Sequence, residues 1–137
     1  MKIVRQLSVF LANKPGTLAS LCKVLAQSGI NIIAMTIVDS VDHAVVRMVV
    51  SDHRAAVHLF GERGTLALES EVVLMEVENK PGGLTEIASK LAKAKINIEY
   101  AYCTVTEGQA AGHLVLKTAN PAQTVKVLSA KPKRRGA

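Results

Sequence analysis

The sequence predicts an α+β fold of two successive βαββαβ units, with antiparallel sheets that carry their helices on one face. Asn13-Lys14-Pro15-Gly16-Thr17-Leu18 returns 66 positions later as Asn79-Lys80-Pro81-Gly82-Gly83-Leu84. The same offset places Ile30-Asn31-Ile32 on Ile96-Asn97-Ile98. In both copies an alternating apolar stretch precedes the turn and an amphipathic stretch follows it. A fixed period over this length indicates an internal duplication.

Each copy begins with a strand and a tight turn. Residues 6–12 place apolar side chains at every second position, on one face, which is typical of a strand. The apolar positions are Leu7, Val9 and Leu11 in the first copy and Val73, Met75 and Val77 in the second. Pro15 fixes its own φ, and Gly16 allows the backbone to bend sharply. The sequence therefore predicts that each Pro-Gly turn joins a strand to a helix.

A helix is expected from about Thr17 to Ser28, with a repeat in the second copy. Its apolar stripe contains Leu18, Leu21, Cys22, Leu25 and Ala26, matched by Leu84, Ile87, Ala88, Leu91 and Ala92. Gly29 suits the left-handed residue that ends a helix. Its counterpart Lys95 would lose about 1 kcal/mol in that conformation. We therefore expect the second helix to end differently, with Asn97 making the turn.

The remaining elements follow the same order in both copies. Strands are expected at 31–39, 44–51, 97–106 and 109–117. Asp52 is expected to cap a short helix that ends near residue 61 or 64, and Asn120-Pro121 to begin the last helix. A further strand is expected around 65–69. The second copy has no equivalent, and we hypothesise that residues 2–5 take its place. The expected domains are 1–70 and 71–130.

Charge and composition limit the function classes. The chain has 137 residues, of which 49% are hydrophobic, and a net charge of +6. Four of its 17 basic residues lie in residues 131–137, so the body has 13 basic and 11 acidic residues. We interpret residues 131–137 as a disordered basic tail. Aromatic residues that could stack on bases make up 3% of the chain, so nucleic-acid binding is not expected.

Several sequence motifs would indicate a membrane, a secreted protein or an enzyme. The sequence has no apolar run of about 18 residues and no signal peptide. Cys22 and Cys103 resemble buried hydrophobic residues in a reducing compartment. We therefore expect a cytoplasmic protein without membrane association. No metal-ligand spacing, phosphate loop or nucleophile motif is visible. A protein that is not an enzyme and holds no metal or cofactor is expected.

Two such turns at matched spacing, each followed by a helix and Ile-Asn-Ile, resemble tandem ACT domains over roughly residues 3–130. The resemblance implies ferredoxin-like units that bind a small molecule, most often an amino acid, and pair side by side with the ligand at the seam. It also implies a regulated partner on a separate chain. Residues 7–16 are similar to the start of acetolactate synthase regulatory subunits. Lys95 in place of glycine and the missing last strand depart from the pattern.

The turns offer chemistry for an α-amino acid. The first N–H groups of a helix have no partner within the helix and favour a carboxylate. The start of the following strand is expected to lie close by, where its carbonyl groups could hold an ammonium. The expected ligand-binding residues are Asn79, Pro81, Gly82, Gly83, Leu84, Asn97 and Ile98 in the second copy, and Asn13, Gly16, Thr17, Leu18, Asn31 and Ile32 in the first. The alternative is that both turns are only structural connections.

The two copies are not equivalent. Gly83 replaces Thr17 and is expected to open the second helix end further. Tyr100 and Tyr102 could floor a pocket or pack at an interface, and Glu99 could meet an ammonium or remain solvated. We therefore expect the second turn to carry the more specific site.

The strand pattern also predicts how the protein assembles. Strand 31–39 is apolar on both faces, and helices cover only one, so a homodimer is expected. The leading hypothesis is an amino-acid-sensing regulatory module. The alternatives are a regulatory subunit of an amino-acid biosynthetic enzyme such as acetolactate synthase and a purely structural oligomerisation domain.

Overall fold

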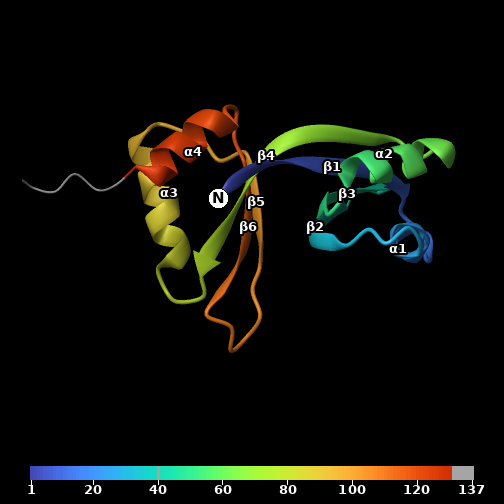
Figure 1. The fold of residues 1–137 in the computed structure, drawn as a ribbon, viewed down its shortest axis with the longest axis horizontal. Coiled ribbons are helices and arrows are strands. Elements are labelled where there is room, and N and C mark those ends of the chain that lie inside the picture. Colours follow the sequence, from blue (N-terminus) through green and yellow to red (C-terminus); the bar gives the residue numbers. More distant parts are fainter. Residues whose placement is uncertain (40, 131–137) are drawn as a thin grey trace, which may run out of the picture. The chain divides into compact units, whose positions relative to one another are not determined.

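The computed structural model describes residues 1–39 and 41–130 (Figure 1). In these residues the strands are β1 (Lys2–Ala12), β2 (Ile32–Asp39), β3 (His43–Val50), β4 (Ala67–Glu78), β5 (Tyr100–Thr104) and β6 (Ala111–Lys117). The helices are α1 (Thr17–Gln27), α2 (His53–Glu62), α3 (Gly83–Lys93) and α4 (Pro121–Ser129). The predicted α+β fold is confirmed. The tail at 131–137 lies outside the described residues.

The chain divides into two compact units. One comprises Val4–Glu71, and the other comprises Met1–Ile3 with the chain from Val72 onward. Hydrogen-bonded strands follow the order β2-β3-β1-β4-β6-β5. The pairs β1–β3, β2–β3, β4–β6 and β5–β6 are antiparallel. Met1–Ile3 therefore group with the unit whose last strand the sequence lacks. We call Val4–Glu71 the first unit and the other part the second unit.

Three strands differ from the sequence-based expectation. The separate strand expected around 65–69 is wrong, because Ala67–Glu78 form one continuous strand that also contains the first strand of the second unit. The strand expected at 97–106 is shorter, since β5 begins at Tyr100. Residues 2–5 are strand, but as the start of β1 rather than a separate element. No glycine, proline or asparagine lies between residues 65 and 78, so no turn residue separates the two strands that were expected there.

A bulge in β2 changes which side chains face the helices. The pairing of β2 with β3 shifts register between Ile32 and Ala34. Strict alternation would put Ile32 and Ala34 on one face, but Ile32 and Met35 pack on the helix-side core. An extra residue in one strand reverses the alternation beyond it. Ile32 therefore shares the helix-side face with Met35 and not with Ala34.

Helices α1 and α3 end in the same way. Ile30 N–H donates to Leu25 O at 2.9 Å, and Ile96 N–H donates to Leu91 O at 2.9 Å. Gly29 has φ 69° and Lys95 has φ 58°, so both occupy the left-handed region that closes this motif. The expectation that Asn97 makes the second turn is wrong. The hydrogen bonds and the burial of Leu91 and Ile96 offset the strain at Lys95.

Replacing Lys95 with glycine is expected to stabilise the protein by about 0.5–1 kcal/mol, because the strain of a left-handed non-glycine residue is removed. The matched variant Gly29→Lys introduces that strain in the first unit and should destabilise by about the same amount. Urea denaturation of both variants measures the difference. Equal midpoints for Lys95→Gly and the unchanged protein would contradict this account.

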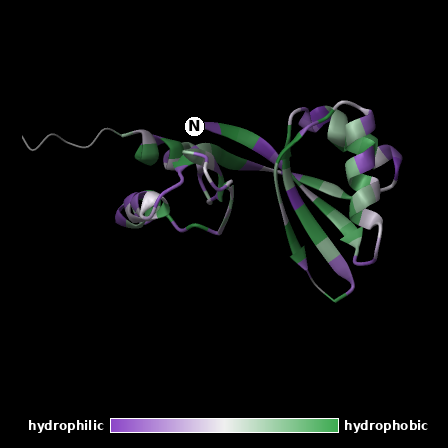
Figure 2. Cartoon of the chain, turned by 90° about the horizontal axis from the view of Figure 1, so that it is seen from below, coloured by the Kyte–Doolittle hydropathy of each residue, from purple (hydrophilic) through white to green (hydrophobic). Residues whose placement is uncertain are grey.

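Each unit has its own helix-covered core. In the first unit it includes Leu7, Leu25, Met48 and Phe60, and in the second it includes Val73, Leu91, Leu114 and Leu116. Figure 2 shows hydrophobic residues running along most of the strands. Burial of these side chains is the main stabilising contribution, at roughly 25 cal/mol per Å² of apolar surface.

The sheet faces away from the helices are also partly buried within a single chain. Ala34 and Val49 in the first unit are 3% and 2% exposed, and Leu74 and Val115 in the second are 8% and 0% exposed. Burial of these positions does not by itself require a second chain. The homodimer itself stays a prediction.

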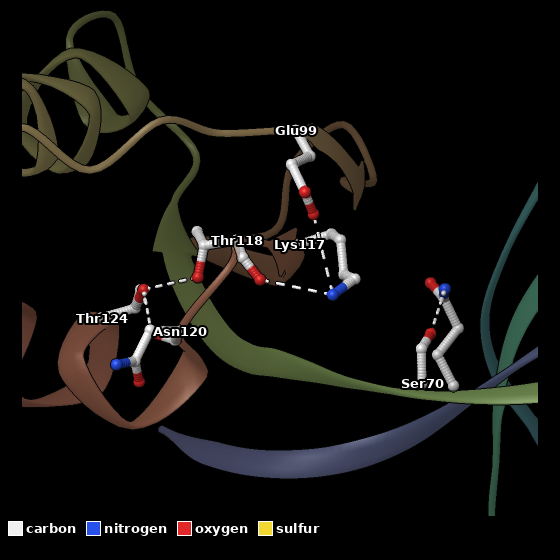
Figure 3. Close-up of polar contacts among 7 residues, drawn as sticks. Ser70, Glu99, Lys117, Thr118, Asn120 and Thr124 are labelled. Carbon is white, nitrogen blue, oxygen red and sulfur yellow. Dashed lines mark hydrogen bonds and ion pairs between the residues drawn. The ribbon is translucent and has the colours of Figure 1, made fainter.

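Side-chain caps fix the starts of α2 and α4, as predicted. Asp52 accepts from Ala55 N–H at 3.1 Å, and Asn120 accepts from Gln123 N–H at 3.0 Å. Beside the second cap, the buried hydroxyls of Thr118 and Thr124 share a 2.7 Å hydrogen bond (Figure 3). These contacts connect the end of β6 to α4 and satisfy polar groups that are out of contact with water.

Candidate ligand-binding site

Both Pro-Gly segments form a β-turn that leads into a helix. Thr17 N–H approaches Lys14 O at 3.5 Å, and Gly83 N–H donates to Lys80 O at 3.1 Å. Gly16 and Gly82 each have φ 88°. This is the geometry of a type II turn, with proline at its second position and a left-handed residue at its third. Glycine is therefore required at 16 and 82 by backbone conformation.

Each turn is tied to the hairpin loop of its own unit by an asparagine. Asn13 Nδ2 donates to Asp39 Oδ1 at 2.7 Å, and Asn79 Nδ2 donates to Gln109 O at 2.9 Å and to Thr106 O at 3.3 Å. The main-chain N–H of Asn79 also donates to Ala110 O at 3.0 Å. The amide donors of Asn79 thus hold the turn against the loop, which supports the structural interpretation for this side chain.

The helix starts beyond the turns leave backbone donors unsatisfied. Gly16 and Gly82 are the N-cap residues, and neither supplies a side-chain hydrogen bond. Glu86 N–H donates to Gly82 O at 3.3 Å, so the helical ladder begins only there. Within residues 1–39 and 41–130, no group accepts from Leu84 N–H or Thr85 N–H, or from the equivalent Leu18 and Ala19. Two adjacent free N–H groups at a helix N-terminus favour an anion.

A hollow of about 230 Å³ adjoins the second turn. Its lining comes from the end of β4, the turn, the start of α3 and the end of β5: Val77, Glu78, Asn79, Lys80, Gly82, Leu84, Thr85, Cys103 and Val105. Leu84 and Val105 are 50% and 44% exposed, so they give the hollow an apolar side open to solvent. We call this hollow the turn pocket.

The turn pocket also carries one charge of each sign. Lys80 Nζ lies 2.6 Å from Glu78 Oε2. The hydrogen bond with Glu78 and the negative charge of Glu78 raise the pKa of Lys80 above the usual lysine value. Both side chains are largely exposed, so the pair contributes little to stability. The first copy has Ala12 where the second has Glu78 and therefore lacks this carboxylate.

The strand starts do not join the turns, and this sequence-based expectation is wrong. Glu78 is level with Ala111 on β6, whereas Tyr100 is level with Lys117 at the other end. Asn97 and Ile98 precede Tyr100, so they lie at the opposite end of β5 and β6 from the second turn. In the first unit, Asn31 O instead accepts from Ser51 N–H at 2.9 Å, and Ile32 pairs with Val50. A helix returns the chain to the opposite end of the sheet before the next strand begins.

Gly83 has a different role from the one expected. An added Cβ there would overlap the carbonyl oxygen of Glu78. The residue is therefore required for close packing of α3 on β4, whatever ligand the site takes. At the equivalent position Thr17 turns its hydroxyl to Ala12 O at 2.9 Å and to Lys14 O at 3.1 Å. Leu18, unlike Leu84, packs against the core of its unit.

The tyrosines and Glu99 also lie away from the turn pocket. Tyr102 pairs with Val115, which alternates with the helix-facing Leu114 and Leu116. Glu99 lies near the far end of β5, where its Oε2 is 3.7 Å from Lys117 Nζ (Figure 3). Sequence reasoning missed Glu78, Lys80, Thr85, Cys103 and Val105. Glu78 could have been found from the sequence, because it stands beside the repeated motif where the first copy has Ala12.

Other site types have little support in the described part of the chain. Within residues 1–39 and 41–130, no group of three or more His, Cys, Asp or Glu side chains could hold a metal ion. The helices found there are too short or too polar to cross a membrane.

Comparison with known proteins gives a family and a fold. The family model described as an ACT domain pair matches residues 1–133. A search of curated proteins found no match. Protein BT0572 from Bacteroides thetaiotaomicron has a similar structure, with TM-score 0.86 and 29% identity, over 92% of this chain and 86% of that chain.

Aspartate kinase structures share the fold. The ligand-free regulatory subunit from Thermus thermophilus has TM-score 0.69 and 13% identity, over 93% of this chain and 95% of that chain. E. coli aspartokinase III, solved in complex with lysine and aspartate, has TM-score 0.51 and 18% identity over 93% of this chain. This chain covers 31% of that enzyme. ACT domains are regulatory modules, and the family match indicates no catalytic family. The chain belongs to the ACT domain pair family.

Proposed function

We propose that this protein is a non-enzymatic regulatory module that binds a free α-amino acid in the turn pocket of its second unit. The observation that carries the proposal is the pair of unpartnered N–H groups at Leu84 and Thr85, both of which line that pocket. Family membership supports a regulatory role. The first turn, without a carboxylate at position 12, is proposed to be mainly structural.

The pocket complements each part of an α-amino acid. The ligand carboxylate accepts hydrogen bonds from the two free N–H groups at the positive end of α3, and Lys80 adds a second positive charge. The ligand ammonium faces the Glu78 carboxylate. Leu84 and Val105 contact an apolar ligand side chain. Binding thus replaces the exposed Lys80–Glu78 ion pair with two ion pairs to the ligand.

A ligand regulates only if it favours one state of the protein. We propose that bound amino acid orders the turn and its hairpin loop, to which Asn79 already ties it. Formation of a homodimer and binding of a separate enzyme would then depend on this ordered state. The measurable quantity is a coupling free energy, typically about 1–3 kcal/mol, between amino-acid binding and partner binding.

Substituting Thr85 with glutamate should abolish amino-acid binding. The new carboxylate would occupy the helix start and repel the ligand carboxylate, while remaining compatible with the helix dipole. The matched control is Ala19→Glu, at the equivalent exposed position of the first unit. The measurement is a thermal-shift screen of the common amino acids. A ligand at a hundred times its dissociation constant stabilises the folded state by about 2.7 kcal/mol.

The pair of variants distinguishes the two turns. We expect the amino acid to raise the melting temperature of the unchanged protein and of Ala19→Glu. The melting temperature of Thr85→Glu should not respond to the amino acid. Loss of response in Ala19→Glu alone would place the site at the first turn and overturn the proposal. No response to any amino acid in the unchanged protein would favour the structural oligomerisation domain.

A second candidate is a regulatory subunit of an amino-acid biosynthetic enzyme. The fold shared with an aspartate kinase regulatory subunit over 93% of this chain favours it as an architecture. Affinity purification of the tagged chain with and without amino acid tests it. Recovery of a stoichiometric catalytic chain supports this candidate, whereas recovery of the homodimer alone contradicts it.

A further inference from the structure

The two units contain equivalent hollows on their helix-bearing faces, and the hollow in the second unit shares Val77 and Glu78 with the turn pocket. In the first unit the hollow measures about 290 Å³ and in the second about 180 Å³. Five lining positions correspond at the 66-residue offset: Leu11 and Val77, Thr17 and Gly83, Ser20 and Glu86, Leu21 and Ile87, and Val24 and Lys90. The duplication has thus kept the hollow and changed its chemistry. We call the larger one the first-unit hollow.

The first-unit hollow has an apolar floor. Leu11 from β1, Leu21 and Val24 from α1 and Phe60 from α2 line it. Three of these belong to the buried residues of the unit, so the floor is held by the core beneath it. A preformed apolar surface of this size suits a short branched or ringed hydrocarbon chain.

Its polar residues are positive or neutral. Arg63, Ser20 and Thr65 line the hollow together with Thr17. Within the described residues, no hydrogen bond or ion pair engages the side chains of Arg63, Ser20 or Thr65. The neighbouring Glu62 pairs with His58 instead. One guanidinium and two hydroxyls beside an apolar floor form a donor set for a carboxylate.

The equivalent hollow in the second unit has the opposite character. Glu76, Glu78 and Glu86 line it with Lys90, and Lys90 Nζ is 3.5 Å from Glu86 Oε1. An anion would meet three carboxylates there. The first-unit hollow has no acidic lining residue, so it also offers nothing to an ammonium group.

We propose that the first-unit hollow is a second binding site, for a small apolar monocarboxylate that lacks an ammonium group. The hydrocarbon chain contacts Leu11, Leu21, Val24 and Phe60. The carboxylate accepts from Arg63 and from the hydroxyls of Ser20 and Thr65. This ligand class is chemically distinct from the α-amino acid proposed for the turn pocket, so the two sites can report on two different compounds.

The test is a titration of the full chain, with labelled leucine and valine methyl groups, followed by nuclear magnetic resonance. The probes are 4-methylpentanoate, leucine and 3-methylbutylamine at neutral pH, each up to about 10 mM, where binding free energies near −3 kcal/mol are detectable. We expect 4-methylpentanoate to shift the methyl signals of Leu11, Leu21 and Val24. Leucine and the amine should leave these signals unshifted. Shifts confined to Leu84, or stronger binding of leucine in this hollow, would overturn the proposal.

Two variants and one control test the proposed donor set. Arg63→Gln should weaken 4-methylpentanoate binding about tenfold, since a charge-assisted hydrogen bond is lost. The control is Arg54→Gln, an exposed arginine on α2, the helix that Arg63 follows, which does not line the hollow. Ser20→Glu copies the second unit and should abolish binding. Unchanged affinity for 4-methylpentanoate in both Arg63→Gln and Ser20→Glu would overturn the proposal. The turn pocket is tested independently, by the thermal shift of Thr85→Glu with amino acids.

Discussion

Replacing Phe60 with alanine is expected to lower the free energy of unfolding by about 3–5 kcal/mol. Phe60 is 1% exposed and packs in the helix-side core of the first unit. Truncation removes the transfer free energy of the ring and leaves a cavity that the surrounding core fills only partly. A loss of this size is a large fraction of the roughly 5–15 kcal/mol that stabilises an ordinary domain.

Phe10 supplies the matched control. It is the other phenylalanine of the chain, but it is 36% exposed. Phe10→Ala should therefore cost about 1 kcal/mol. Equilibrium urea denaturation followed by far-ultraviolet circular dichroism measures both variants. Similar losses in the two variants would show that burial of Phe60 is not the dominant contribution we assign to it.

Gly83→Ala is the second substitution with a large expected effect, a loss of about 3 kcal/mol. The added Cβ would overlap the Glu78 carbonyl oxygen, which is a backbone atom at the end of β4. That oxygen also accepts from Lys80 N–H at 3.0 Å, so it cannot move without disturbing the turn. Overpacking against a fixed backbone typically costs about 1–3 kcal/mol, and occasionally more.

Gly61→Ala is the control for Gly83→Ala. Gly61 is also helical, and a Cβ there would meet no atom within 4 Å. Alanine has the higher helix propensity, so Gly61→Ala should stabilise by roughly 0.5–1 kcal/mol. Thermal unfolding of both variants provides the comparison. A Gly83→Ala protein as stable as the unchanged chain would contradict the packing role. Thr85→Glu is the better probe of ligand binding, because its position on α3 is exposed and tolerates a side chain.

The two units therefore offer different candidate binding sites, although they arose by duplication. The second has a turn pocket with free N–H donors and both charges of Glu78 and Lys80. The first has an apolar hollow with Arg63 on its rim. Duplication followed by changes at positions 12/78, 20/86 and 24/90 can give one chain two ligand classes without changing its fold.

Local sequence determined the elements that local chemistry controls. Asp52 and Asn120 cap their helices as predicted, because a capping side chain bonds a backbone group only three residues away. Gly16 and Gly82 adopt the positive φ that the Pro-Gly turn requires. Alternation and helical periodicity located the strands and helices, and the repeat showed that they come in two sets.

Only the tertiary structure decided which residues meet. It placed Asn97 and Ile98 at the far end of the sheet from the turn, and it brought Cys103 and Val105 to the turn instead. It imposed a left-handed conformation on Lys95, because the packing of Leu91 and Ile96 outweighs a strain of about 1 kcal/mol. It also showed that Gly83 is needed for packing of α3 against β4, whereas the sequence had suggested that Gly83 opens the start of the helix. Sequence patterns report the preference of a residue for its own local conformation, whereas distances across a sheet depend on strand direction and register. For this reason the sequence identified both turns, while the structure decided what surrounds each of them.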